Sequence, residues 1–224
     1  MKFKKSIVYL LCFLFFFIVL FIYNFKIFFL NDYKIRGIDI SHYQNVKNWN
    51  LISQSNRFCI MKATQGNKFV DPTFHNYWLN AKKNKLVRGA YHYFAPNISA
   101  EKQFENFRKQ VKLVTNDLPP ILDIEEKEVD MNEANKWLQL AENYYGVKPI
   151  VYSSYNFYLI FMKGRINQYP LWLYFNKRFT LRPALDNCIM LQYDQYGTTE
   201  GITGDVDLDV FLGNDVQFKK LLVK

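Results

Sequence analysis

The sequence predicts an α/β domain with an eight-stranded, barrel-like sheet, preceded by one N-terminal transmembrane helix. Apolar runs of strand length alternate with helical stretches five times, and three further strand-like runs follow. Acidic residues stand at the ends of several of these runs, where barrel proteins place their functional side chains. The first 30 residues differ from the rest because they are almost entirely apolar.

The N-terminal segment has the pattern of an uncleaved signal anchor. Lys2, Lys4 and Lys5 precede residues 6–25, which carry no charge, and about 20 apolar residues span a bilayer. No small-residue cleavage site follows, so a cleaved signal peptide is the less favoured alternative. The lysines predict a cytoplasmic N-terminus. We therefore expect residues 1–30 to form a single-pass anchor and residues 31–224 an extracytoplasmic domain.

The remaining chain, about 190 residues, is long enough for one sizeable core. The formal net charge is +9, and the four lysines before residue 31 leave +5 for the domain. This excess suits an anionic polymer or a membrane surface. We find no nucleic-acid-binding motif, and the sequence does not indicate an oligomeric state.

The first five strands are each followed by a helix. Strands are predicted at residues 33–40, 58–63, 87–94, 121–124 and 149–153. Helices are predicted at residues 49–55, 71–85, 99–114 and 130–145, with a short one ending near 163. Asp71-Pro72 and Asp130 are typical helix starts, and Gly146 is a typical stop. Ser99 begins the third helix, with Lys102 or Gln103 at the capping-box position.

The last part of the chain predicts three strands with little helix between them, at residues 171–175, 189–193 and 206–210, and a short C-terminal helix. Cys59 and Cys188 lie in or beside apolar runs and are expected to be buried, while Cys12 lies in the anchor. His42, His75 and His92 lack the spacing of metal ligands, so neither a metal nor a cofactor is expected.

The most informative segment is the predicted strand at residues 121–124, which ends in two acids. Asp123 and Glu125 are two residues apart, so their side chains point to one face, with Cα atoms about 6.5 Å apart. Like charges this close push their pKa values apart, which leaves one acid protonated and the other ionised. Cleavage of a glycosidic bond needs such a pair. Ordinary acids at a solvated strand end are the competing interpretation.

Two more acids converge on the same edge of the barrel. Asp39 ends the first strand and Asp207 lies in the last. The first and last strands of a closed barrel are neighbours, so we expect Asp39 and Asp207 to lie side by side near Asp123 and Glu125. Apolar neighbours of these acids raise carboxyl pKa values by desolvation.

Short motifs along the domain resemble the glycoside hydrolase family 25 lysozymes, which are N-acetylmuramidases. They occur in that family's order from Ile35 to about Phe211. The matching segments are residues 37–41 (GIDIS), 61–66 (MKATQG), 89–94 (GAYHYF), 122–125 (LDIE), 149–152 (PIVY), 171–173 (LWL), 191–193 (LQY) and 206–209 (VDLD). The resemblance implies a flattened (β/α)5β3 barrel that hydrolyses the β-1,4 bond between N-acetylmuramic acid and N-acetylglucosamine in peptidoglycan.

The resemblance also implies roles for particular residues. Glu125 is similar to the general acid/base, and Asp123 to the partner that orients and stabilises the reacting N-acetyl group. Asp39 and Asp207 resemble supporting acids. The residues that would line the substrate groove are Tyr91, Tyr152, Trp172 and Gln192. For each aromatic residue, ordinary core packing is the alternative, since 18% of the chain is aromatic.

Two positions depart from the family's pattern. Gln65 stands where the family usually has Glu, which puts a local salt bridge in doubt. Asp209 stands where the family usually has Asn, which adds an acid two residues from Asp207 and favours a raised pKa nearby.

Three classes of function remain open from the sequence. The first is an anchored muramidase, which the four acids favour. The second is a catalytically inactive glycan-binding module on the same fold, because fold does not fix function. The third is an envelope protein that binds a partner, for which a large exposed apolar face would argue.

Overall fold

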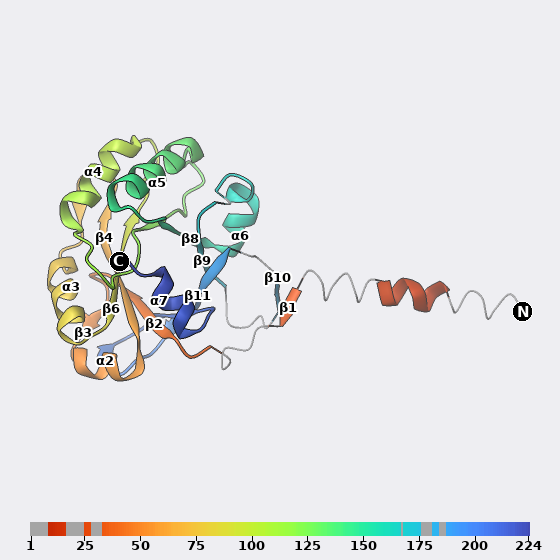
Figure 1. Ribbon diagram of the computed structural model, residues 1–224, viewed down its shortest axis with the longest axis horizontal. Helices are drawn as coiled ribbons and strands as arrows, with labels where there is room; N and C mark the ends of the chain where they lie inside the picture. Colours follow the sequence, from red (N-terminus) through yellow and green to blue (C-terminus); the bar gives the residue numbers. More distant parts are fainter. Residues whose placement is uncertain (1–8, 17–24, 28–32, 167, 176–180, 184–186) are drawn as a thin grey trace, which may run out of the picture.

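A closed ring of eight strands forms the centre of the domain (Figure 1). The computed structural model describes residues 9–16, 25–27, 33–166, 168–175, 181–183 and 187–224. The ring strands are β2 (Arg36–Ile40), β4 (Phe58–Gln65), β6 (Val87–Tyr93), β7 (Ile121–Asp123), β8 (Ile150–Ser154), β9 (Leu171–Tyr174), β11 (Cys188–Gly197) and β13 (Val206–Phe211). Pairing of β2 with both β4 and β13 closes the ring, which confirms the predicted barrel.

The last strand runs against the others. The pairings from β2 through β4, β6, β7, β8 and β9 to β11 are parallel, whereas β13 is antiparallel to β11 and β2. The beginning of β13 therefore lies at the same edge as the carboxyl ends of the other strands. Asp207 pairs directly with Asp39 in this register, as the closure of the barrel predicted.

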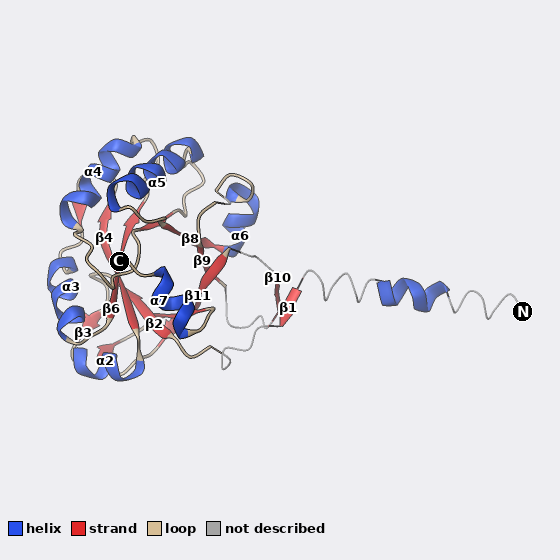
Figure 2. Cartoon of the chain, viewed as in Figure 1, coloured by secondary structure: helices blue, strands red, loops and turns tan. Residues whose placement is uncertain are grey.

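Helices surround the ring on its outside (Figure 2). They are α2 (Trp49–Ser55), α3 (Phe74–Lys83), α4 (Ala100–Gln110), α5 (Met131–Tyr145) and α6 (Tyr155–Phe157), which continues as the π-helix η2 (Tyr158–Met162). Each follows one of the first five ring strands, and the last three ring strands have no such helix between them in the described chain. Cys59 and Cys188 are buried, as predicted.

Local capping explains where two helices begin and end. The Asn48 side chain accepts hydrogen bonds from the backbone N–H groups of Asn50 and Leu51 at the start of α2. Asp130 accepts one from Asn132 at the start of α5, and Gly146 ends that helix with φ of 68°. The bounds predicted for both helices are confirmed.

The predicted start of α3 and end of α4 were wrong. Asp71 does not cap α3, which begins at Phe74; its carboxylate instead accepts bonds from Thr73 and His42. The helix α4 ends at Gln110 rather than near residue 114, because Val111 is extended. Ser99 is the N-cap residue of α4, as its predicted start requires, but it makes no side-chain cap hydrogen bond.

Apolar side chains fill the ring at the end where its parallel strands begin, which we call the lower end. We call the inward residues Ile60, Ile121, Ile150, Met190 and Phe211 the lower level; all are buried. Helix α7 (Asp215–Leu221) closes this end, since Phe218 packs against Phe58 and Phe211 with ring centroids 5.9 and 5.1 Å away. Figure 1 shows α7 lying across the ring of strands. A second apolar cluster joins the outer strand faces to the helices.

Three short strand pairings and the N-terminal segment complete the described chain. The strands β3 (Asn45–Val46) and β12 (Ile202–Thr203) pair with each other, and β5 (Phe69–Val70) extends β4. Residues 9–16 are helical, and β1 (Phe25–Ile27) pairs with β10 (Leu181–Pro183). No helix within the described residues has the length and apolar character needed to cross a membrane. Most of the predicted anchor, at residues 1–8, 17–24 and 28–30, lies outside the described residues.

Candidate active site

Alternate residues of a strand point into the ring. Along the strands, these inward side chains change from apolar to polar towards the carboxyl end of the ring. Ile121 in β7 points inward, and the next inward position is Asp123, followed by Glu125 just beyond the strand. In β8, Ile150 is followed by Tyr152 in the same way. We call the inward polar and aromatic residues above the lower level the upper level: Asp39, Tyr91, Asp123, Tyr152, Trp172, Gln192, Asp207 and Asp209.

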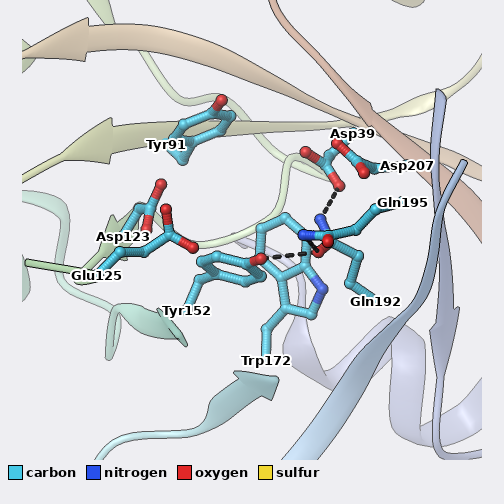
Figure 3. A pocket seen from close by; sticks show the side chains of 9 residues that line it. All are labelled: Asp39, Tyr91, Asp123, Glu125, Tyr152, Trp172, Gln192, Gln195 and Asp207. Carbon is cyan, nitrogen blue, oxygen red and sulfur yellow. Dashed lines mark hydrogen bonds between the residues drawn. The ribbon is translucent and has the colours of Figure 1, made fainter. Parts of the chain in front are cut away.

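One pocket opens at this level and encloses about 430 Å³, part of it open to solvent. All eight residues that the sequence predicted for the site line it, together with Gln195. Figure 3 shows Asp123 and Glu125 on one side of the pocket and Asp39 and Asp207 on the other. Four acids from three separate parts of the sequence therefore face one cavity.

A chain of hydrogen bonds fixes the side of the pocket that holds Asp39 (Figure 3). The Tyr152 hydroxyl donates to Oε1 of Gln192 over 2.7 Å, and Nε2 of Gln192 donates to Oδ2 of Asp39 over 2.7 Å. Gln195 donates to the same Gln192 oxygen over 3.3 Å. Because donors and acceptors alternate along this chain, the Gln192 amide has one orientation and holds the Asp39 carboxyl in place.

Trp172 belongs to both the pocket and the core. Its side chain lines the cavity, yet the residue is only 2% exposed. Its ring lies 4.4 Å from that of Tyr152, and its Nε1 donates to Oδ1 of Asp209 over 2.9 Å. The two interpretations of Trp172, groove residue and core residue, thus describe two parts of one side chain.

Gln195 is a pocket residue that the sequence did not reveal. Simple alternation from Gln192 along β11 would point residue 194 inward. The pairing of β11 with β13 shifts register between Gln192 and Asp194 and again before Gly197. Such a bulge exchanges the faces of the residues that follow it, and no local sequence signal marks its position.

Burial changes the acidity of the carboxyls on β7. Burial raises the pKa of Asp123 well above its usual value, and the Glu125 charge adds to the effect, while Lys62 opposes it. Oδ1 of Asp123 is buried without a hydrogen-bond partner. Glu125 is exposed to the pocket opening; surrounding protein still raises its pKa, against the opposing charge of Lys62. Raised carboxyl pKa values of this kind are typical of sites that transfer protons.

The opposite side of the pocket also favours protonated carboxyls. Burial, followed by the charge of Asp207, raises the pKa of Asp39 well above its usual value. Burial, followed by Glu125 and Asp194, raises the pKa of Asp207 to about 7. Asp209 is fully buried, and burial together with the Asp39 and Asp207 charges raises its pKa strongly. This agrees with the expectation that an acid at position 209 adds to the crowding of charge.

Comparison with known proteins identifies the family. The sequence model of the glycosyl hydrolases family 25 matches residues 38–202, which contain most of the ring and three of the four pocket acids. The chain belongs to this family. As a family 25 member it is a glycoside hydrolase.

Relatives and solved structures agree with this assignment. The chain is 36% identical over 197 residues to the uncharacterized protein YegX of Escherichia coli K12, covering 81% of this chain and 71% of YegX. It is 28% identical to the autolytic lysozyme of Clostridium acetobutylicum, over 79% of this chain and 56% of that protein. A family 25 glycosyl hydrolase structure from Bacillus anthracis superimposes with a TM-score of 0.77 at 29% identity, covering 86% of this chain and 95% of that one.

The pocket of this family 25 hydrolase is lined by carboxyl groups that can supply protons and hold charge. Among the described residues, no cluster of His, Cys, Asp and Glu is arranged to hold a metal ion. Asp123 and Glu125 lie at the strand end that faces the opening, and tyrosine and tryptophan rings stand beside them. Flat aromatic faces beside carboxyls suit a sugar ring and the oxygen of its glycosidic bond.

Proposed function

We propose that this chain is a muramidase, which hydrolyses the β-1,4 bond between N-acetylmuramic acid and N-acetylglucosamine in peptidoglycan. The observation that carries the proposal is the pair Asp123 and Glu125, consecutive inward residues at the end of β7 that face a pocket lined by two more acids. Relatives named as lysozymes or N,O-diacetylmuramidases support the substrate class.

In the proposed mechanism Glu125 is the general acid and then the general base. It is the acid of the pair that is open to the pocket, so its proton can reach the glycosidic oxygen of a bound glycan. Loss of that proton to the leaving sugar lets Glu125 next accept a proton from water. The aromatic residues Tyr91, Tyr152 and Trp172 would hold the sugar rings, with Gln192 and Gln195 as polar neighbours.

Asp123 is proposed to orient the N-acetyl group of the reacting sugar. Its buried Oδ1 lacks a partner within the protein, so an amide N–H of the substrate would satisfy it. The N-acetyl oxygen would then attack the anomeric carbon as the glycosidic bond breaks and the leaving sugar oxygen takes the Glu125 proton. Water, giving a proton to Glu125, would next displace the N-acetyl oxygen from the opposite face, so the configuration would be retained, as in other substrate-assisted glycosidases. Asp39 and Asp207 would support this charge distribution from the opposite wall. NMR detection of the first-formed anomer tests retention, since the inverted anomer would contradict it.

The bond that is cut can be identified directly. The full chain, purified in detergent, is incubated with purified peptidoglycan, and new reducing ends are identified by mass spectrometry after borohydride reduction. We expect reduced muramic acid. Reduced glucosamine or cleaved peptides would contradict the proposal, and binding without new reducing ends would indicate an inactive glycan-binding module.

We further propose that residues 1–30 anchor residues 31–224, the catalytic domain, to the outer side of the membrane. The uncharged residues 6–25 after three lysines support this arrangement. The protein should fractionate with membranes and keep its own N-terminus, and external protease should digest the domain in spheroplasts. A soluble form that begins near Asp32, or full protection from protease, would contradict the anchor or its orientation.

A further inference from the structure

Lys62 is a cation among the acids of the barrel interior. Phe58 and Ile60 of β4 point inward in the apolar part of the ring, and Lys62 is the next residue on that face. The inward faces of the described ring strands carry several carboxyls, but Lys62 is their one lysine or arginine. Its positive charge therefore lies among groups that are acidic.

The contacts of Lys62 favour its charged form but do not neutralise it. The ammonium donates to Oε1 of Gln65 over 2.8 Å. It also lies over the rings of Phe69 and Tyr93, 5.6 and 5.0 Å from their centroids. An amide oxygen and two ring faces attract a cation, yet all three groups are neutral. The positive charge thus remains available to the nearby carboxyls.

The same contacts bring Lys62 to the catalytic pair. Tyr93, whose ring the ammonium covers, pairs with Asp123 in the register of β6 and β7. The Tyr93 hydroxyl donates to Glu126 over 3.2 Å, next to Glu125. In agreement with this placement, the Lys62 charge lowers the pKa values of Asp123 and Glu125, against the effect of burial.

We propose that Lys62 is a positioning residue whose uncompensated charge, preserved by its neutral partner Gln65, allows Asp123 and Glu125 to share the end of β7 with one of them ionised. The roles of the two acids rest on the proposed function. Without the cation, two carboxyls at one strand end would both favour their protonated forms, and the anion that orients the substrate would be lost.

Other titratable groups also face Asp123 and Glu125 and add to the charges around them. Asp71 and the two acids themselves raise the pKa of Lys62, although burial lowers it more. Around the acids stand Asp39, Asp207, Glu126, Tyr91, Tyr93 and Tyr152. These groups are acidic, so removal of Lys62 leaves no opposing charge from the inward strand faces.

The test is a titration of the carboxyl groups by NMR, using the full chain in detergent with ¹³C-labelled Asp and Glu. The Glu125 signal is assigned by its absence in Glu125→Gln. We expect Lys62→Met to raise the titration midpoint of Glu125 by about one pH unit. This is the effect of removing one unit charge several ångströms away at the effective dielectric constant of such a pocket. Gln65→Glu, which places an anion on Lys62, should raise it by less.

Two controls separate charge from structure. Lys62→Arg should restore a midpoint close to that of the wild type, and Gln65→Met, which adds no charge, should leave it nearly unchanged. On peptidoglycan, the whole pH profile of Lys62→Met should move to higher pH. A residue that only stabilises the fold would lower the activity without moving the profile.

The outcomes are distinct. An unchanged Glu125 midpoint in Lys62→Met, or in Gln65→Glu if Lys62→Met does not fold, overturns the proposal. If the midpoint moves but the wild-type protein releases no sugar reducing ends, the charge relation stands and the proposed muramidase function falls.

Discussion

The lower and upper levels of the barrel interior are formed by successive inward-pointing residues, two positions apart on the same strands. On β7, Ile121 is buried in the apolar cluster, whereas Asp123 is a buried carboxyl with a strongly raised pKa. On β8, Ile150 and Tyr152 make the same change. Two residues of strand thus separate aliphatic side chains of the core from side chains that line the pocket. Mutations at the two levels should therefore affect different measurements.

The largest expected effect is on activity at the upper edge. Glu125→Gln keeps the shape of the side chain but cannot exchange a proton, so hydrolysis of peptidoglycan should fall by about 10²- to 10⁴-fold. The free energy of unfolding at neutral pH should not fall, because the variant removes an acid whose ionisation burial opposes. A variant that hydrolyses peptidoglycan at the wild-type rate would show that Glu125 is not the proton donor.

The lower level should give the opposite result. Ile121→Ala removes a fully buried side chain and should reduce the free energy of unfolding by about 2–5 kcal/mol. The pH dependence of activity of the remaining folded protein should match that of the wild type. Urea unfolding and a pH–activity profile measure the two quantities. A moved profile would mean that the two levels are coupled.

A smaller effect is expected from Asp207 on the pH dependence of the free energy of unfolding. The pKa of Asp207 is about 7 in the folded protein, compared with 3.8 for the unperturbed group. Between these values the folded chain binds more protons than the unfolded chain, so the Asp207 contribution to stability is lost as the pH rises from about 4 to about 7. Asp207→Asn should reduce this loss by on the order of 1 kcal/mol, because the pocket is partly open to solvent. Equal slopes for wild type and variant in urea unfolding would contradict the assignment.

The smallest effect is expected at Asp209 in acid solution. At a pH of about 4 its buried carboxyl is protonated, and Asp209→Asn preserves an acceptor for Nε1 of Trp172. Stability should then agree within about 0.5 kcal/mol. Towards neutral pH the variant should become the more stable protein, since an amide has no ionised form to disfavour. Asp209→Leu, which also removes the acceptor, should be less stable than Asp209→Asn by about 1–3 kcal/mol at either pH.

Features that depend on local chemistry could be predicted from the sequence. Asp130 caps α5 and Gly146 ends it, because a carboxylate near free N–H groups and a residue that tolerates positive φ act over a few residues. The pairing of Asp39 with Asp207 could be predicted with one further rule, that the first and last strands of a closed barrel are neighbours. The eight predicted pocket residues followed from these arguments together with the family resemblance.

Features that depend on distant partners could not be predicted. Asp71 resembles a helix cap, but its carboxylate binds His42, 29 residues away, and the helix begins later. Gln195 enters the pocket through a bulge that depends on pairing with β13. The bond between Trp172 and Asp209 joins residues 37 positions apart. In each case a tertiary contact outweighs the local preference.

The pairing of β2 with β13 has a consequence for how the enzyme is made. Asp39 lies in the first ring strand, yet its partner Gln192 is 153 residues later in the chain, and Asp207 is later still. During synthesis on the ribosome, a growing chain has Asp39, Asp123 and Glu125 long before β13 has emerged. Closing so long a loop is slow and comes late. The cavity with all four carboxyls therefore exists only once nearly the whole polypeptide has been translated, so unfinished chains lack the complete pocket.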